Sequence, residues 1–334
     1  MMNSRVEEHA VRGIESCMGM PIGQMNAHLE DELVMRVGIP HKGGHLTFHA
    51  FQESFPAMVS ASAFWHQQSN SFKIPEATNL SELDLALDSA GYTAMKLWQI
   101  KGKQNGMAGV FPWSYSQYIE LAALLSPNWY SQPDLCCEHE LASNQAEIDY
   151  RINATATLLE GSLRVIYAWQ NELAKEVSAN TVANMIKPMV PVIQGWSASD
   201  YCRSLDLLMQ VWERWQPWLA APTLIGVGSV CRRSLTHRTH GLHAILAALE
   251  GRIPSGSRLH MFGVKGSCLK DLKMLDWVAS ADSMAYDMGA RMKALKAGHS
   301  NSMEHRSTEM TEWMQAAGRR IAPAAGDQFR LTFA

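Results

Sequence analysis

"LALDSAGYTAM", residues 85–95, is the stretch that decides the fold. It begins as a short apolar run, typical of a buried strand, and ends on a carboxylate at Asp88. Ser89, Ala90 and Gly91 then make a turn of small residues, and Tyr92 follows directly. In α/β barrels the chemistry is built at the carboxyl ends of the strands. The stretch therefore predicts a strand that delivers Asp88 to a functional site.

The same alternation of short apolar runs and longer segments of helical period continues along the chain, as expected of parallel strands joined by crossover helices. Helices are predicted at 116–125, 145–169, 197–215 and 240–250, the last ending at Gly251. Seven strands are predicted, and residues 57–64 can hold an eighth; the seven are 45–51, 83–88, 129–136, 189–194, 223–228, 259–264 and 277–283.

Evenly spaced strand and helix units favour one closed (β/α)8 barrel, a TIM barrel of the α/β class, over an open doubly wound sheet. The open sheet would need "GVGS", residues 226–229, as its phosphate loop, and this segment lacks the third glycine of the dinucleotide fingerprint. We expect residues 41–334 to form the barrel and residues 1–40 to be an N-terminal extension.

Composition limits the class of protein. Hydrophobic residues make up 47% of the 334 residues, which is enough apolar surface for a large core, and the net charge of −3 does not favour a polyanion partner. No run approaches 18 uninterrupted apolar residues, so no membrane span is predicted. Six scattered cysteines without a signal segment indicate a reducing, cytoplasmic location.

Polar groups close five of the predicted strands. Two carboxylates at one barrel mouth can divide the work of a nucleophile and a general acid/base, and an aspartate with a glutamine suits the edge of a purine-like ring. Each of these residues taken singly could instead cap a helix or hydrogen-bond to loop backbone groups. Capping does not, however, require that five strands end in this way. The residues are Asp88, Asp134, Gln194, the Gly228–Ser229 pair and Asp282, with Tyr92 and Phe262 as rings for the base faces or for the core.

Six motifs in order resemble the tRNA-guanine transglycosylase superfamily over residues 83–291. They are "LDSAGYTAM", "YSQYIELAALLSPNWYSQPDLCCE", "PVIQGWS", "IGVGSV", "LHMFGV" and "ADSMAY". The wording "GVGSVCRR", "LHMFGVK" and "ADSMA" is most similar to the 7-deazaguanine DNA transglycosylase branch, found in phages and bacterial genomic islands. This resemblance implies a glycosyltransferase that exchanges guanine in DNA for a 7-deazaguanine such as preQ0.

The resemblance also implies roles for individual residues. Asp282 would be the nucleophile that forms a covalent aspartyl-nucleotide intermediate, with Asp287 as the competing candidate, and Asp88 would be the general acid/base. Asp134 would read N1 and the exocyclic amine of the base, and the backbone N–H of Gly228 would meet O6. The implied base-binding set is Ser89, Tyr92, Asp134, Cys136, Gln194, Gly195, Gly228, Ser229, Phe262 and Gly263.

The expected partners are DNA, guanine and the 7-deazaguanine base, and accessory DNA-modification proteins are left open. Phosphate contacts are predicted at Arg232, Arg233 and Arg238, for which a solvated helix face is the alternative. The zinc ligands of the tRNA enzymes have no counterpart, because no cysteine follows Cys268. We therefore expect no zinc subdomain, no metal and no cofactor, and read the histidines at 237, 240 and 243 as surface or nucleic-acid contacts.

Three rival functions remain at this stage. The same chemistry could act on tRNA, for which the missing zinc site is the discriminating feature. A non-catalytic nucleic-acid-binding barrel could have kept the pocket, although it would not need both Asp88 and Asp282. An unrelated barrel hydrolase could use two carboxylates on a sugar, but it would not need Asp134 and Gln194.

Overall fold

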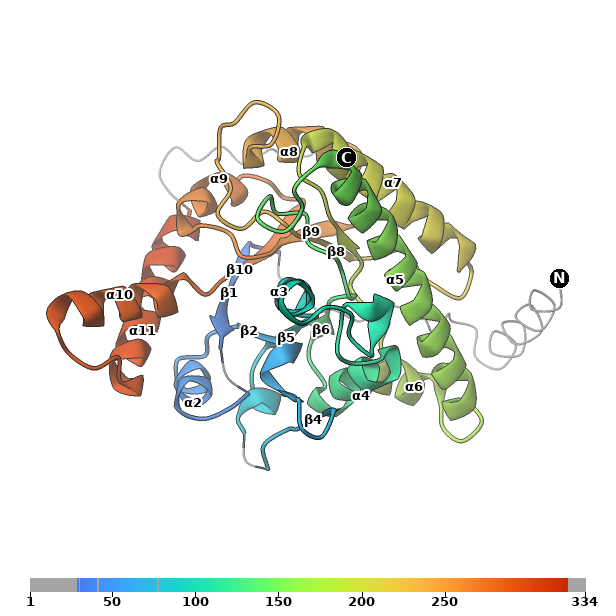
Figure 1. Ribbon diagram of the computed structural model, residues 1–334, viewed down its shortest axis with the longest axis horizontal. Coiled ribbons are helices and arrows are strands. Elements are labelled where there is room, and N and C mark those ends of the chain that lie inside the picture. Colours follow the sequence, from blue (N-terminus) through green and yellow to red (C-terminus); the bar gives the residue numbers. More distant parts are fainter. Residues whose placement is uncertain (1–28, 30, 41, 77, 324–334) are drawn as a thin grey trace.

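A computed structural model describes residues 29, 31–40, 42–76 and 78–323. An eight-stranded parallel sheet lies in the middle of the molecule, in the strand order β6-β5-β2-β1-β10-β9-β8-β7 (Figure 1). The fold is therefore of the α/β class. The strands are β1 Val34–Ile39, β2 Ala57–Ser60, β5 Leu85–Asp88, β6 Trp129–Tyr130, β7 Val192–Ile193, β8 Leu224–Val227, β9 Arg258–Met261 and β10 Val278–Ser283.

The sheet is curled, and backbone contacts join its two edge strands. Ser131, directly after β6, forms a parallel bridge with Val190, just before β7. The Val190 N–H donates to Tyr130 O at 2.8 Å, and the Gln132 N–H donates to Val190 O at 2.9 Å. The Gln132 side chain strengthens this junction, because its Oε1 accepts the Val192 N–H at 3.0 Å.

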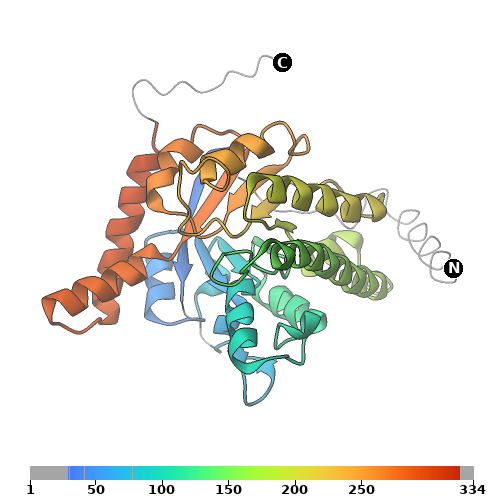
Figure 2. The same cartoon turned by 45° about the horizontal axis from the view of Figure 1, so that its top comes forward.

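Helices surround the sheet (Figure 1). The long helices α5 and α7 lie side by side, and α10 and α11 form a hairpin that projects from the body (Figure 2). The segment after β2 holds a small antiparallel hairpin, β3 Trp65–His66 with β4 Ser71–Phe72, and its described residues form no α-helix. The helices are α2 His45–Gln52, α3 Gly91–Lys101, α4 Tyr115–Leu125, α5 Gln145–Leu173, α6 Ala179–Met185, α7 Ala198–Arg214, α8 Leu242–Leu249, α9 Leu269–Leu272, α10 Ala285–Ala297 and α11 Met303–Ile321.

The strands are largely apolar because side chains of the curled sheet's inner face and of the outer helices cover them. All residues of β8 are buried, and β5 is buried up to its last residue, Asp88. One hydrophobic cluster runs through strands and helices alike. None of the helices in the described part of the chain is long and apolar enough to cross a membrane.

Most of the predicted elements are confirmed. The runs at 83–88, 223–228, 259–264 and 277–283 contain strands, and 57–64 contains the eighth, β2. The four predicted helices are α4, α5, α7 and α8, and Gly251 follows α8 with a positive φ of 73°. The predicted strands at 129–136 and 189–194 shrink to two residues each, with extended chain around them.

The predicted strand at 45–51 is wrong, because this segment is helix α2. Its β-forming residues Thr47, Phe48 and Phe51 suggested a strand. In the structure Leu46, Thr47 and Ala50 are buried on one side, at helical spacing, while Phe48 and Phe51 are exposed. Tertiary packing thus overrode the local preference.

Strand β1 was missed because a charged residue interrupts its apolar run. Arg36 is only 3% exposed and donates to both carboxylate oxygens of Asp84 at 3.0 and 3.1 Å, and to Asp84 O at 2.9 Å. The buried charge is therefore paired by a residue 48 positions away. The sheet begins inside the segment assigned to the N-terminal extension; residues 1–28 of that segment lie outside the described residues.

Replacing Gln132 by Leu should destabilise the fold by about 2–4 kcal/mol, because a buried amide that pairs the Val192 N–H would be lost. Urea unfolding followed by circular dichroism measures this. Gln52→Leu, at an exposed position, is the matched control and should change stability by less than about 0.5 kcal/mol. Equal stability of the two variants would show that the side chain of Gln132 does not hold the sheet edges together.

Candidate active site

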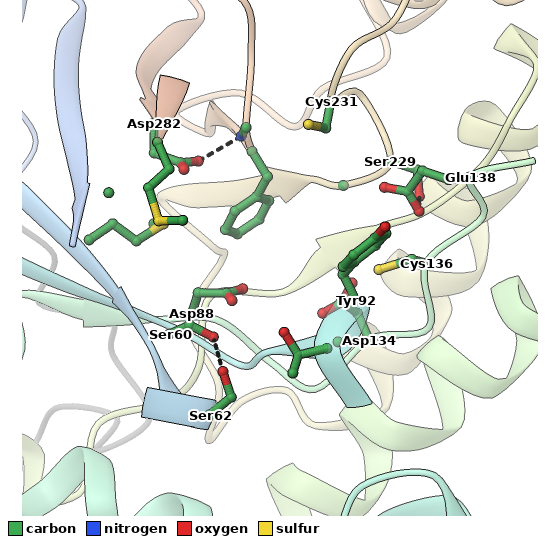
Figure 3. A pocket seen from close by; sticks show the side chains of 18 of the residues that line it. Ser60, Ser62, Asp88, Tyr92, Asp134, Cys136, Glu138, Ser229, Cys231 and Asp282 are labelled. Atoms are coloured by element: carbon green, nitrogen blue, oxygen red, sulfur yellow. Dashed lines mark hydrogen bonds between the residues drawn. The ribbon is translucent and has the colours of Figure 1, made fainter. Parts of the chain in front are cut away.

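A cavity of about 540 Å³ opens where the strands end, and the predicted residues gather around it (Figure 3). Asp88 and Asp282 both line it, although 194 positions separate them in the sequence. Among the predicted catalytic and base-binding residues, Ser89 and Gly195 do not reach the cavity surface. The predicted residues at its wall are Asp88, Tyr92, Asp134, Cys136, Gln194, Gly228, Ser229, Phe262, Gly263 and Asp282.

The turn after β5 brings two carboxyl groups to one wall. Oδ2 of Asp88 accepts the Ala90 N–H at 3.0 Å, and Ala90 has the left-handed φ of 67°. Gly91 then begins α3, and a Cβ at this position would lie 2.5 Å from Asp134 O. Only glycine allows this approach. The small residues behind Asp88 therefore let β5 end directly against the Asp134 loop.

Asp134 is held from two sides. Its Oδ1 accepts the Ser89 hydroxyl at 2.8 Å, and its Oδ2 accepts the side-chain amide of Gln194. Ser89 is itself fixed by its N–H, which donates to Ser131 Oγ at 2.9 Å. Burial, followed by the charge of Asp88, raises the pKa of Asp134 to about 7. Ser89 thus acts behind the cavity wall by orienting Asp134.

Asp88 faces the cavity and has a proton affinity suited to catalysis. Burial and then the charge of Asp282 raise the pKa of Asp88 to about 6, against the opposing effect of the Ala90 N–H. A carboxyl group with a pKa near neutrality can give up and take back a proton in one catalytic cycle.

Asp282 lies near the end of β10, with its side chain 14% exposed. Its Oδ1 accepts the Gly263 N–H at 2.8 Å, drawn as a dashed line in Figure 3, and lies 3.3 Å from His260 Nε2. His260 is fully buried on β9, and Ser280 Oγ lies 2.8 Å from its Nδ1. Burial lowers the pKa of His260, which favours a neutral ring that donates to Asp282. One carboxylate oxygen is thus fixed, and Oδ2 has no hydrogen-bond donor among the described residues.

Asp287, the competing candidate for the nucleophile, lies elsewhere. It is 2% exposed on α10, outside the residues that line the cavity. Arg306 donates to its Oδ1 at 2.7 Å, and Arg291 lies 2.8 Å from its Oδ2. These two cations make Asp287 a structural anion of the α10 and α11 hairpin.

The backbone of the β8 loop differs from the prediction. The Gly228 N–H donates to Ile193 O at 3.0 Å within the sheet, so it is not available to O6 of a base. The next residue, Ser229, has the positive φ of 53°, and its N–H has no acceptor among the described residues. Gly228 is needed for space instead, since a Cβ there would lie 2.1 Å from Gln194 Nε2.

The basic stretch after this loop divides into different roles. Arg232 is exposed and lines the cavity, and Arg238 is exposed outside it. Arg233 does not fit the predicted phosphate contact, because it is 5% exposed and its guanidinium lies 4.2 Å over the Trp196 ring. It donates to the carbonyl oxygens of Gly195, Trp196, Ser229 and His240. Gly195 thus takes part in the loop scaffold through its carbonyl.

The three histidines predicted as surface or nucleic-acid contacts lie in two different environments. His237 and His240 stack on each other with ring centroids 3.4 Å apart, whereas His243 Nε2 lies 3.0 Å from Asp271 Oδ2. Within the described residues, no three His, Cys, Asp or Glu side chains are grouped to hold a metal ion.

Several cavity residues were missed in the sequence. Glu138 and Glu140 follow Asp134 in "PDLCCEHE" and were not among the predicted site residues, yet both line the cavity, as do Cys231 and Met284. The Tyr92 hydroxyl donates to Glu140 Oε1 at 2.6 Å. His260 could have been noticed as the one ionisable side chain between the apolar residues Leu259 and Met261.

A protein-family model described as DpdA, DeoxyPurine in DNA protein A, matches residues 81–330. The chain belongs to the DpdA family. This match confirms the resemblance to the 7-deazaguanine DNA transglycosylase branch, and it spans the cavity residues from Asp88 to Met284. DpdA membership indicates a transglycosylase-like protein that modifies DNA. The chain matches none of the curated proteins.

Asp134→Asn should stabilise the protein at pH 8 by on the order of 2–4 kcal/mol. The pKa of Asp134 in the folded state, about 7, lies above its ordinary value of 3.8, so the folded protein binds the proton more tightly. Its ionisation therefore costs stability as the pH rises from about 4 to about 7, and the gain of the variant should vanish near pH 4.

Thermal unfolding at several pH values measures this difference. Glu213→Gln at an exposed position is the control and should show no such pH dependence. A loss of stability in Asp134→Asn at pH 8 would mean that the ionised carboxylate stabilises the fold.

Proposed function

We propose that this DpdA-family protein is a glycosyltransferase that replaces guanine in DNA with a 7-deazaguanine of the preQ0 type. The observation that carries the proposal is the meeting of Asp88, Asp134 and Asp282 around one cavity large enough for a purine. The family match to a deoxypurine-in-DNA protein supports DNA as the polymer.

Asp282 is the nucleophile in this proposal. Gly263 and His260 hold its Oδ1, which leaves Oδ2 to attack C1′ of the target nucleotide. The bond from C1′ to guanine N9 breaks as the bond from C1′ to the aspartate forms, and the departing guanine takes a proton from Asp88. The incoming 7-deazaguanine then loses its N9 proton to Asp88, attacks C1′ and releases Asp282. The two halves balance, so the exchange consumes no cofactor.

The base is recognised along its edge and on its faces. Ionised Asp134 accepts hydrogen bonds from N1–H and from the exocyclic amine of the base. The Ser229 N–H donates to O6, and Gln194 orients this side of the site through its bonds to Asp134 and Ser229. Tyr92 and Phe262 cover the two faces, since both rings line the cavity. Burial raises the pKa of the Cys136 thiol far above its usual range, so this side chain is a neutral wall of the base site.

The proposal treats the curled sheet as a closed (β/α)8 barrel. The bridge between Ser131 and Val190 supports closure, since it pairs the two edges of the eight-stranded sheet. The described residues from β1 onward then form one catalytic domain, and an N-terminal extension would end before β1. Arg232 and Arg238 are the proposed phosphate contacts, because both are exposed cations and Arg232 stands at the cavity wall.

Nucleoside mass spectrometry tests the function. Cells that express the protein with a source of 7-cyano-7-deazaguanine should accumulate a 7-deazaguanine nucleoside in DNA and none in tRNA. Asp88→Asn is the negative control, because an amide cannot exchange the proton. Modified tRNA with unmodified DNA would contradict the proposed polymer.

Asp282→Ala should abolish the covalent adduct between protein and DNA, because the attacking oxygen is removed. Denaturing electrophoresis of the protein after reaction with a labelled guanine-containing oligonucleotide detects the adduct. Asp287→Asn is the matched control, and the part of this variant that remains folded should still form the adduct. Loss of the ion pairs with Arg291 and Arg306 should lower its stability by about 3–5 kcal/mol. An adduct that survives Asp282→Ala and disappears in folded Asp287→Asn would reverse the assignment.

A further inference from the structure

Four side chains form a continuous hydrogen-bonded chain along one wall of the cavity. Asp134 accepts the Gln194 amide, Gln194 Oε1 lies 2.6 Å from Ser229 Oγ, and Ser229 Oγ lies 3.1 Å from Glu138 Oε2. Ser229 Oγ also accepts the Cys137 N–H at 2.7 Å. Three chain segments that are distant in sequence are thus connected from one carboxyl group to another.

Counting protons limits the directions of the bonds in this chain. The Gln194 amide group donates to Asp134, so its carbonyl oxygen faces Ser229 and needs a donor. Ser229 has one hydroxyl proton. Ser229 Oγ also lies 3.1 Å from Glu138 Oε2, so this proton is either shared between the two acceptors or donated to Gln194, in which case Glu138 must be the donor to Ser229.

The chain therefore has two polarities. An ionised Asp134 favours a protonated Glu138. An ionised Glu138 instead attracts the Ser229 proton, which favours a reversed Gln194 amide and a protonated Asp134. Burial is the main cause that raises the pKa of Glu138, and Arg233 and Ser229 oppose it while Glu140 adds to it. Burial thus favours the neutral form of Glu138.

Base binding selects one polarity. Asp134 must be ionised to accept the two N–H donors of the base, so Glu138 is the protonated partner. In the proposed pose the Ser229 N–H meets O6, and position 7 is the neighbouring point on the same purine edge. Ser229 and Glu138 lie together on the side of the cavity away from Asp282 and Ser60 (Figure 3).

We infer that Glu138 reads the substituent at position 7 of the incoming base as a neutral acid, and that it selects a hydrogen-bond acceptor such as a nitrile. This inference rests on the proposed function. The acid proton turns from Ser229 Oγ to the nitrile nitrogen, and Ser229 Oγ keeps the Cys137 N–H as a donor. A cationic aminomethyl group would demand an ionised Glu138 and would push a proton onto Asp134, which would weaken binding of the base edge.

The test compares two incoming bases with the full-length protein and a guanine-containing oligonucleotide. The kcat/KM values for 7-cyano-7-deazaguanine and 7-aminomethyl-7-deazaguanine are measured beside exchange of labelled guanine. We expect the wild type to prefer the cyano base by about tenfold or more, the effect of one hydrogen bond to a buried acid.

Two variants of Glu138 distinguish the effect of a hydrogen-bond donor from the effect of a negative charge. Glu138→Gln keeps a donor that cannot ionise and should retain the preference within about threefold, while Glu138→Leu should lower it by about tenfold or more. Glu120→Gln, at an exposed position of α4, is the matched control and should leave the ratio as in the wild type.

The outcomes distinguish this inference from the function on which it rests. No guanine exchange by the wild type would overturn the proposed function and, with it, the role of Glu138. Intact guanine exchange with an unchanged base preference in Glu138→Leu would overturn the role of Glu138 alone. Wild-type preference for the aminomethyl base would also overturn it, since that result requires an ionised carboxylate. So would loss of the preference in folded Glu138→Gln, since a neutral donor would then not be enough.

Discussion

Gly91 lies so close to the Asp134 loop that an added methyl group would be 2.5 Å from its backbone oxygen, and the site depends on this contact. It lets the turn after Asp88 pack against Asp134, so that two carboxyl groups share one wall. Each then loses water and feels the charge of another aspartate, which raises both pKa values toward neutrality. The raised pKa of Asp88 thus follows from how tightly a small-residue turn can pack.

Hydrogen-bond donors without charge hold these carboxyl groups. Backbone N–H groups of Ala90 and Gly263 reach Asp88 and Asp282, and the Ser89 hydroxyl reaches Asp134. Cations would have depressed the pKa values and occupied the carboxylate oxygens. Asp287 shows the alternative, because it lies five positions after Asp282 and is bound by Arg291 and Arg306. The same residue type serves structure in one place and is suited to chemistry in the other.

Sequence patterns predicted the fold well wherever an apolar run was uninterrupted, as at 85–87 and 224–227. They failed where a distant partner decided the outcome. Strand β1 was not predicted because Arg36 interrupts its apolar run, and the carboxylate that pairs with Arg36 belongs to Asp84, 48 positions away. Arg233 looked like a phosphate ligand, but loop carbonyls that come together only in the fold occupy its guanidinium. A local sequence pattern reflects burial and periodicity, but it does not show which distant side chains or backbone groups a residue pairs with.

The order of six motifs indicated the family, and together with the alternation of apolar runs and helical segments it indicated the α/β class. The same motifs contain the ten predicted catalytic and base-binding residues that line the cavity. Only the tertiary structure decided which N–H groups remain open, which aspartate faces the cavity and how Glu138 connects to Asp134. These properties depend on water exclusion and on hydrogen-bond partners from separate strands. Neither exists until the sheet has curled and brought its strand ends together.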